Sequence, residues 1–231
     1  MFGFLPGGRR GACTAATTVF AAGALTLVAS VLTGPQPPPA PPRSAYAAPA
    51  DEHHPGQPRT TAMHRSQPSE IVIPTIGLRT RVDSVTRATD GSVALPADPD
   101  HAGWYTGSVT PGENGNAITV GHVDSHLGPA AFYGLGALRN GSRITVTRHD
   151  GSTAHFTVSG IEVWAKDAFP SERVYGPTTT PTLTLITCTG WDSTHQTYRS
   201  NLVITAQLTP PPEIRNGNLS RAPADGALRP G

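Results

Sequence analysis

Short apolar runs separated by turn-forming residues constrain the fold of this chain more than any other feature. Between residues 69 and 209 the runs are rich in Val, Ile and Thr, which favour strands, and Gly, Pro or Asn lies between most of them. The runs cover residues 71–73, 78–82, 117–120, 143–147, 153–158, 160–164, 182–187 and 201–208. This pattern predicts an all-β domain, a closed or nearly closed barrel, with one or two short helices, one of them over residues 129–138.

The N-terminal segment has a different composition. Residues 11–33 form an uncharged, apolar run of 23 residues, long enough at about 1.5 Å per residue to cross a hydrocarbon core of about 30 Å. Arg9 and Arg10 precede it, which favours a cytoplasmic location for residues 1–10. We therefore expect a single-pass membrane anchor at the cell membrane, with the rest of the chain extracellular. A cleaved signal peptide is the alternative, because Ala45-Tyr46-Ala47 resembles a small-residue cleavage site.

Two other segments lack the apolar residues needed for a core. Residues 34–68 are rich in Pro, Ala, Gln, His and Arg, which predicts an extended, disordered linker, and residues 210–231 predict a disordered tail. One domain remains, residues 69–209, and it is long enough to bury a substantial core. The formal net charge of +1 and the lack of a basic stripe argue against a nucleic-acid partner.

Cys188 is the residue that most directly indicates chemistry. The chain has two cysteines, and the other, Cys13, lies in the apolar N-terminal run, so the expected domain has one thiol and no internal disulfide. Cys188 directly follows the run 182–187, and Arg199 lies two residues before the run 201–208. If these strands pair antiparallel, Leu202 and the alternate residues after it face the core, and Cys188 and Arg199 share the opposite, groove face. A small buried hydrophobe is the alternative interpretation of Cys188.

Arg199 and His122 have the chemistry that a cysteine nucleophile needs. A nearby cation favours the thiolate, and an arginine can bind a substrate carbonyl and the oxyanion that forms on attack. A histidine can protonate the leaving amine and later deprotonate the incoming nucleophile, and His122 follows the strand 117–120 through Gly121. Arg199 could instead be a solvated residue at a strand end.

Other histidines are weaker candidates. His126 and His195 are the rivals of His122, and His195 could line the site without reacting. His122, Asp124 and His126 could also be interpreted as a metal cluster, but no further Cys or His follows at ligand spacing. We therefore expect neither a metal nor a cofactor.

These residues resemble the motifs of a known family. Thr184-Leu185-Ile186-Thr187-Cys188 resembles the TLxTC signature of sortases, the membrane-anchored cysteine transpeptidases of Gram-positive bacteria. Gly121-His122 resembles the family's catalytic His segment, and Arg199, 11 residues after the cysteine, matches the third motif. The sequences of residues 121–125, 128–132 and 188–190 are most similar to those of the class F sortases of actinobacteria.

The resemblance implies an eight-stranded sortase β-barrel and a specific reaction. It implies that Cys188 is the nucleophile, His122 the general acid and base, and Arg199 the residue that binds substrate and stabilises the oxyanion. The enzyme would cleave an LPxTG-like sorting signal between Thr and Gly and pass the thioester-bound acyl group to an amine, commonly on a peptidoglycan precursor, or to water. Thr187, Asp124 and His195 would line or support the site. We expect a monomer.

Two alternative functions remain at this point. An exported L,D-transpeptidase is also cysteine-dependent, but its motif has Gly before the cysteine and Arg two residues after it, where this chain has Thr187 and Gly190. A non-catalytic, tethered β-domain for adhesion or cell-wall binding would not need a single thiol with His122 and Arg199 at converging strand ends.

Overall fold

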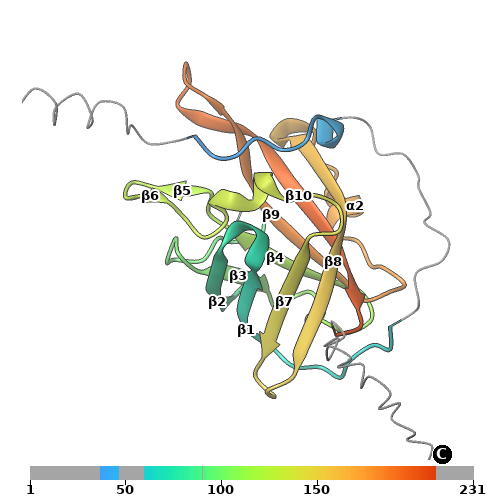
Figure 1. Ribbon diagram of the computed structural model, residues 1–231. Coiled ribbons are helices and arrows are strands. Elements are labelled where there is room, and N and C mark those ends of the chain that lie inside the picture. Colours follow the sequence, from blue (N-terminus) through green and yellow to red (C-terminus); the bar gives the residue numbers. More distant parts are fainter. Residues whose placement is uncertain (1–36, 47–59, 90, 212–231) are drawn as a thin grey trace, which may run out of the picture. The chain divides into compact units, whose positions relative to one another are not determined.

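A computed structural model describes residues 37–46, 60–89 and 91–211, and within them it shows a closed barrel (Figure 1). Eight strands follow one another around the barrel in the order β1-β2-β3-β4-β9-β10-β8-β7. Their bounds are β1 Pro68–Ile73, β2 Leu78–Val85, β3 Ala102–Tyr105, β4 Asn116–Gly121, β7 Arg143–Arg148, β8 Thr153–Ala165, β9 Thr182–Asp192 and β10 Thr197–Thr209. The predicted all-β, eight-stranded architecture is confirmed.

The remaining described elements are short. A two-stranded ribbon, β5 Asp124–Ser125 with β6 Gly128–Pro129, follows β4. The 3-10 helices are η1 Arg43–Tyr46, η2 Pro74–Ile76, η3 Tyr133–Ala137 and η4 Lys166–Ala168, and the described residues contain one α-helix, α2 Ser171–Tyr175. The helix expected over residues 129–138 is therefore the shorter 3-10 helix η3.

The strands that carry the candidate residues are neighbours in the sheet. β4 and β9 run parallel, with Val120 opposite Ile186, and β9 and β10 form a long antiparallel hairpin, with Asn201 opposite Cys188. In a parallel pair the C-terminal ends of both strands lie at the same edge. β4 ends at Gly121, directly before His122, and its pairing with β9 ends at Ile186, two residues before Cys188, so His122 and Cys188 follow the same end of this strand pair.

The barrel interior is filled by one apolar cluster. As the side-chain alternation predicts, its β10 members are Leu202, Ile204, Ala206 and Leu208. The interior also contains Ile71 and Ile73 from β1, Phe156 from β8, and Leu183 and Leu185 from β9, all at most 1% exposed. Because the even-numbered residues of β10 fill the interior, Val203 and Asn201 lie on the outside of the barrel.

Two strand predictions are wrong in detail. β3 has no counterpart among the predicted strands, because it is only four residues long and contains Gly103. A Cβ at Gly103 would lie 2.9 Å from Val85 Cγ1, so the glycine permits the close parallel pairing of β3 with β2. The runs at 153–158 and 160–164, predicted as separate strands, form the single strand β8, whose pairing with β10 shifts register between Thr205 and Ala206.

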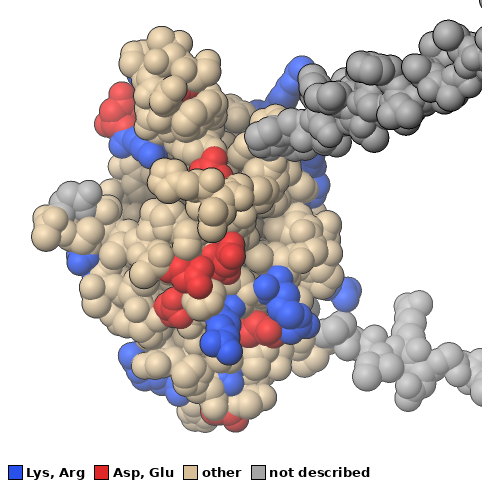
Figure 2. Space-filling view, turned by 90° about the vertical axis from the view of Figure 1, so that its left-hand side faces the viewer, with Lys and Arg blue, Asp and Glu red and all other residues tan. Residues whose placement is uncertain are grey.

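The expected membrane anchor over residues 11–33 and the expected tail beyond residue 211 lie outside the described residues. Within the residues that the structure describes, no helix has the length and apolar character needed to span a membrane. Charged side chains of both signs lie beside one another on the face viewed in Figure 2.

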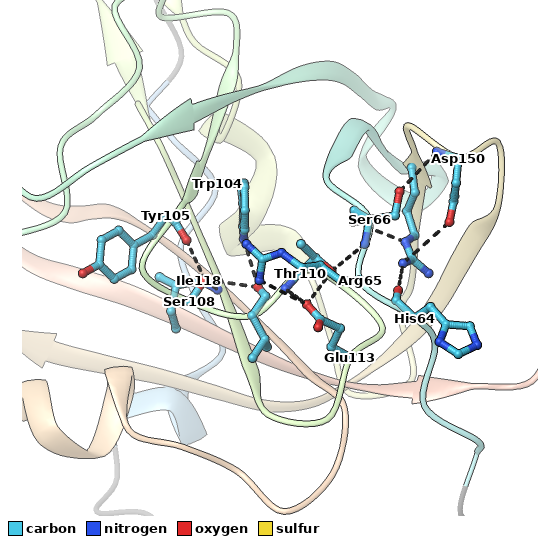
Figure 3. Close-up of polar contacts among 12 residues, drawn as sticks. His64, Arg65, Ser66, Trp104, Tyr105, Ser108, Thr110, Glu113, Ile118 and Asp150 are labelled. Carbon is cyan, nitrogen blue, oxygen red and sulfur yellow. Dashed lines mark hydrogen bonds and ion pairs between the residues drawn. The ribbon is translucent and has the colours of Figure 1, made fainter.

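The last part of the expected linker is attached to the barrel. Residues 60–67, here called the strap, end where β1 begins (Figure 3). The guanidinium of Arg148, whose side chain is 1% exposed, donates to the backbone carbonyls of His64 and Ser66. The Met63 N–H donates to the Gly112 carbonyl at 2.8 Å, and the Ser66 N–H donates to Thr110 Oγ1 at 3.0 Å. The strap is thus bound to β7 and to the loop before β4.

Candidate active site

A groove with an apolar floor lies on the outside of the barrel. The floor belongs to a second cluster, which includes Ile118 and Val120 of β4, Ile186 of β9 and Val203 of β10. One wall includes residues 91–93 and 95 of the loop after β2, and the other wall is formed from residues between 166 and 177, the segment that contains α2. The groove has a volume of about 990 Å³, which is within the usual range for a ligand site.

Cys188 lies in this groove, as the side-chain alternation predicted. It is half-buried and free, and it lines the groove together with Gly121, Thr187 and Asn201. A half-buried thiol at the edge of a long groove is accessible to an extended peptide, whereas a core thiol is not. The interpretation of Cys188 as a small buried hydrophobe is therefore not supported.

The backbone around His122 is fixed from two sides. Thr187 Oγ1 donates to the Gly121 carbonyl at 2.8 Å, which joins the residue before Cys188 to the residue before His122. On the other side, the Phe132 N–H donates to the His122 carbonyl at 2.9 Å. Gly121 is required here, because a Cβ at that position would lie 2.7 Å from the Phe132 ring. Thr187 thus supports the site by joining the two candidate strand ends.

The His122 ring has one hydrogen-bond partner. Its Nε2 lies 3.1 Å from the Pro96 carbonyl oxygen, at the end of the loop that forms one groove wall. A carbonyl can only accept, so Nε2 carries the proton and, in the neutral ring, Nδ1 is the basic nitrogen. This bond ties the orientation of His122 to the groove wall.

Arg199 lies nearer the turn of the hairpin than the sequence predicted. β9 and β10 continue past the predicted strand ends, so Cys188 is opposite Asn201, and Arg199 is two residues closer to the turn. Arg199 Nη1 donates to Asp192 Oδ2 at 3.0 Å, and the guanidinium side chain is 62% exposed. The hydrogen bond from His195, followed by those from the Thr194 N–H and Arg199, holds the pKa of Asp192 at about 2. The predicted supporting residue His195 contacts Asp192, at 2.8 Å, and neither His195 nor Arg199 is among the residues that line the groove.

Tyr198 is a site residue that the sequence analysis missed. Its hydroxyl donates to a carboxylate oxygen of Asp124, the third predicted supporting residue, and its ring packs edge-on against Trp191 at 5.0 Å. Burial and then the Asp124 hydrogen bond raise the pKa of Tyr198, so the phenol remains protonated. Asp124 is two residues after His122, and Tyr198 directly precedes Arg199. One hydrogen bond therefore joins the His122 loop to the hairpin that carries Arg199.

Asn116 holds the α2 wall and was also missed. Its Nδ2 donates to the carbonyls of Val174 at 2.9 Å and Gly176 at 3.2 Å, and its Oδ1 accepts from Thr184 Oγ1 at 2.7 Å. Asn116 is 8% exposed, so these bonds form away from water. A single side chain joins the floor strands β4 and β9 to the C-terminal end of α2.

The alternative metal site formed by His122, Asp124 and His126 is not assembled. His126 is exposed, His122 contacts Pro96, and Asp124 contacts Tyr198. In the part of the chain that the structure describes, no group of three His, Cys, Asp or Glu side chains could hold a metal ion.

Comparison with known proteins identifies the family. The sortase domain family matches residues 71–209, which is more than half of the chain and includes the whole groove. The chain belongs to the sortase family of cysteine transpeptidases. No curated protein matches this sortase.

Solved structures agree with the sortase fold. Sortase A from Corynebacterium diphtheriae is 23% identical with a TM-score of 0.51, and the match covers 68% of this chain and 66% of that one. Its lid mutant has the same identity and TM-score, with 77% of that chain covered. Sortase C1 from Streptococcus agalactiae is 20% identical with a TM-score of 0.49, covering 62% of this chain and 67% of that one. At 23% identity, the likeness to the two sortase A structures shows the fold alone.

Proposed function

We propose that this sortase is a membrane-anchored transpeptidase that cleaves an LPxTG-like sorting signal between Thr and Gly. The observation that supports this most is the free, half-buried Cys188 in an extended groove, joined through Thr187 and Gly121 to the backbone of His122. The acyl acceptor is an amine, such as one on a peptidoglycan precursor, or water. The similarity of residues 121–125 and 188–190 to class F sortases supports assignment to that class.

The first half of the reaction forms a thioester. The Cys188 thiolate attacks the carbonyl carbon of Thr, and the C–N bond to Gly breaks as the tetrahedral intermediate collapses. His122 delivers a proton to the departing amine. Arg199 binds the carbonyl oxygen while it carries negative charge; a guanidinium has five N–H donors, so the bond to Asp192 leaves others for substrate.

The second half transfers the acyl group. The acceptor amine attacks the thioester carbon, the C–S bond breaks, and Cys188 returns as a thiolate. His122 takes the proton that the amine loses, which restores both residues. If water attacks the thioester in place of the amine, the acyl group is released as a free acid. The binding of the acceptor amine decides the ratio of transfer to hydrolysis.

The membrane anchor and location belong to the same proposal. Residues 11–33 span the membrane, residues 1–10 are cytoplasmic, and the barrel is extracellular and acts as a monomer. Alkaline extraction of cell membranes checks this: the full chain should stay in the membrane fraction, and external protease should reach the barrel. Release by alkali, or protection from protease, would contradict it.

The test of the reaction uses the purified full chain and a fluorogenic LPxTG peptide. We expect cleavage between Thr and Gly and a covalent peptide thioester on Cys188 in mass spectra. Cys188→Ala should abolish both, and His122→Ala and Arg199→Ala should reduce cleavage by at least about 1000-fold with unchanged circular dichroism. Unchanged cleavage in Cys188→Ala would refute the assigned nucleophile. A folded chain that binds cell walls but cleaves no peptide would instead favour the non-catalytic adhesion domain.

A further inference from the structure

The end of the groove away from Cys188 holds a cation in a fixed arrangement. Arg87 lines the groove, its Nε donates to Tyr105 Oη at 3.0 Å, and its guanidinium carbon is 5.9 Å from the Tyr105 ring centroid. Among the described residues, no carboxylate forms an ion pair with Arg87. The two terminal NH₂ groups of Arg87 are therefore available to a ligand in the groove.

A second hydrogen-bond donor is present in the lining of the same groove. Tyr175 also lines the groove, and while burial raises the pKa of its phenol, the nearby Arg87 charge acts in the opposite direction. A planar guanidinium with a neighbouring hydroxyl suits a carboxylate, which can accept two parallel hydrogen bonds from the guanidinium. Among the described residues that line the groove, Lys166 is a second cation and Glu172 is the one acidic side chain.

The strand register gives the distance from the thiol. Trp104 pairs with Thr119, which pairs with Leu185, so Tyr105 lies about four residues before Cys188 along β9. Four residues of strand measure about 13 Å, and a bound extended peptide covers the same length with about four residues. Arg87 lies at or just beyond that level, because Val85 is the residue that pairs with Tyr105.

The groove suits the part of the substrate that remains bound. In the two-step transfer, the acyl part stays on Cys188 while the amine partners exchange, so the long, walled surface serves the residues on the N-terminal side of the cleaved bond. In an LPxTG-like signal, Leu is the fourth residue counted back from that bond. Arg87 therefore lies beside the first or the second residue before this Leu in the bound peptide.

We propose that Arg87, supported by Tyr105 and Tyr175, binds an acidic side chain one or two residues before the Leu of the sorting signal. This inference rests on the proposed function, and it narrows the substrates to signals that carry Asp or Glu at this point. Tyr105 holds the guanidinium in place, and Tyr175 offers its hydroxyl to the same carboxylate. The sorting signal is thus read over five or six residues rather than four.

The experiment compares two pairs of peptides on the full chain. Within each pair, Glu or Gln occupies one of the two positions before Leu, and the rest of the peptide is constant. The Glu peptide of at least one pair should have a kcat/KM about threefold to fivefold higher, as for an exposed ion pair, and the ratio should fall towards one in high salt. Arg87→Gln should remove this preference, and Arg87→Lys should retain part of it.

Arg79→Gln is the matched control, because it removes an equal charge from β2, the strand that leads into the loop of Arg87. Arg79 is paired with Glu70 and does not line the groove, so its substitution should leave the preference for Glu unchanged. Equal rates for both members of each pair on the wild-type chain, or a preference that survives in Arg87→Gln, would overturn the inference.

Peptide binding to Cys188→Ala, followed by fluorescence anisotropy, separates this inference from the reaction itself. Tighter binding of a Glu peptide that depends on Arg87 supports the acidic subsite even if no peptide is cleaved, in which case only the proposed reaction fails. Cleavage without any Glu preference in rate or binding leaves the reaction standing and rejects the subsite. Neither cleavage nor binding of any peptide rejects both.

Discussion

At the scale of single residues, short polar connections orient the groups around the thiol. Tyr198 bonds to Asp124, Asp192 bonds to both Arg199 and His195, and His122 bonds to the Pro96 carbonyl. The Tyr198 bond joins the β9–β10 hairpin to the His122 loop, the His122 bond joins that loop to Pro96, and the Asp192 bonds lie within the hairpin. Precise placement matters because a displacement of about 1 Å in a reacting group can lower a rate by about 100-fold.

Tyr198→Phe tests the connection between the His122 loop and the hairpin. It removes the hydroxyl that donates to Asp124 but retains the ring that packs on Trp191. The free energy of unfolding should fall by only about 1 kcal/mol, the usual net value of one hydrogen bond, while kcat falls by up to about 100-fold. Urea unfolding and steady-state kinetics measure the two effects. In a double-mutant cycle with Asp124→Ala, additive losses of activity would show that the bond has no positioning role.

Asp192 should titrate at an unusually low pH because of its neighbours. Its pKa of about 2 is below the ordinary value, so its interactions with His195 and Arg199 are present above about pH 4 and are lost as the pH falls through about 2. NMR titration of this carboxyl should show a larger upward shift in His195→Ala than in Arg199→Ala, because the His195 bond has the larger effect. An unchanged pKa in His195→Ala would contradict this assignment.

The sequence predicted the reacting groups better than the residues that hold them. Cys188 and its outward face follow from strict side-chain alternation, which holds within any strand whatever its length. The bonds of Asp192 to Arg199 and of Tyr198 to Asp124 could not be predicted. Asp192 and Tyr198 both lie in the part of the hairpin that extends beyond the predicted strand ends. The position of Arg199 relative to Cys188 depends on the same extension, and the alternation alone does not reveal it.

At the scale of elements, the groove depends on how α2 is held against the barrel. α2 has five residues and no side-chain hydrogen bond at its N-terminal cap, so its own hydrogen bonds give it little stability. Asn116 holds its C-terminal end, and the Arg173–Glu162 ion pair at 2.9 Å joins it to β8. Sequence patterns do not reveal the Asn116 contacts, since they join residues about 60 positions apart.

Asn116→Ala should loosen the α2 wall but leave the reactivity of the Cys188 thiol nearly unchanged. It leaves two backbone carbonyls and the Thr184 hydroxyl without their partner, which should cost about 2–3 kcal/mol of unfolding free energy. KM for the sorting peptide should rise more than kcat falls, and the alkylation rate of Cys188 by iodoacetamide should hardly change. Asn140→Ala, at an exposed turn, is the control and should affect none of these. A change in kcat with constant KM would contradict a wall-holding role.

At the scale of the whole described domain, the strap makes part of the expected linker integral to the barrel. Arg148 is buried in β7, donates to two strap carbonyls and lies 3.8 Å from a carboxylate oxygen of Asp150, so the strap supplies two of the polar partners of this buried charge. Composition did not predict this, because a segment without apolar runs, such as residues 60–67, can still bind through its backbone groups. The folded unit therefore begins before β1.

Arg148→Met tests the contribution of the strap. The substitution keeps an apolar stem but leaves the carbonyls of His64 and Ser66 without their donor, so the free energy of unfolding should fall by about 3 kcal/mol. Urea unfolding gives the value, and faster hydrogen exchange at Met63 and Ser66 would identify the strap as the site of the loss. Arg143→Met, at the exposed start of the same strand, is the control and should change stability by less than about 0.5 kcal/mol. Equal losses in both variants would contradict a special role for Arg148.

The parallel pairing of β4 with β9 has a consequence for synthesis. The groove floor joins segments more than 60 residues apart, and β10, which supplies Asn201 and Tyr198, is the last strand of the barrel to leave the ribosome. A nascent chain that ends before β10 carries the thiol without its neighbours. The groove and the hairpin that carries Arg199 can therefore be complete only after β10 has been translated.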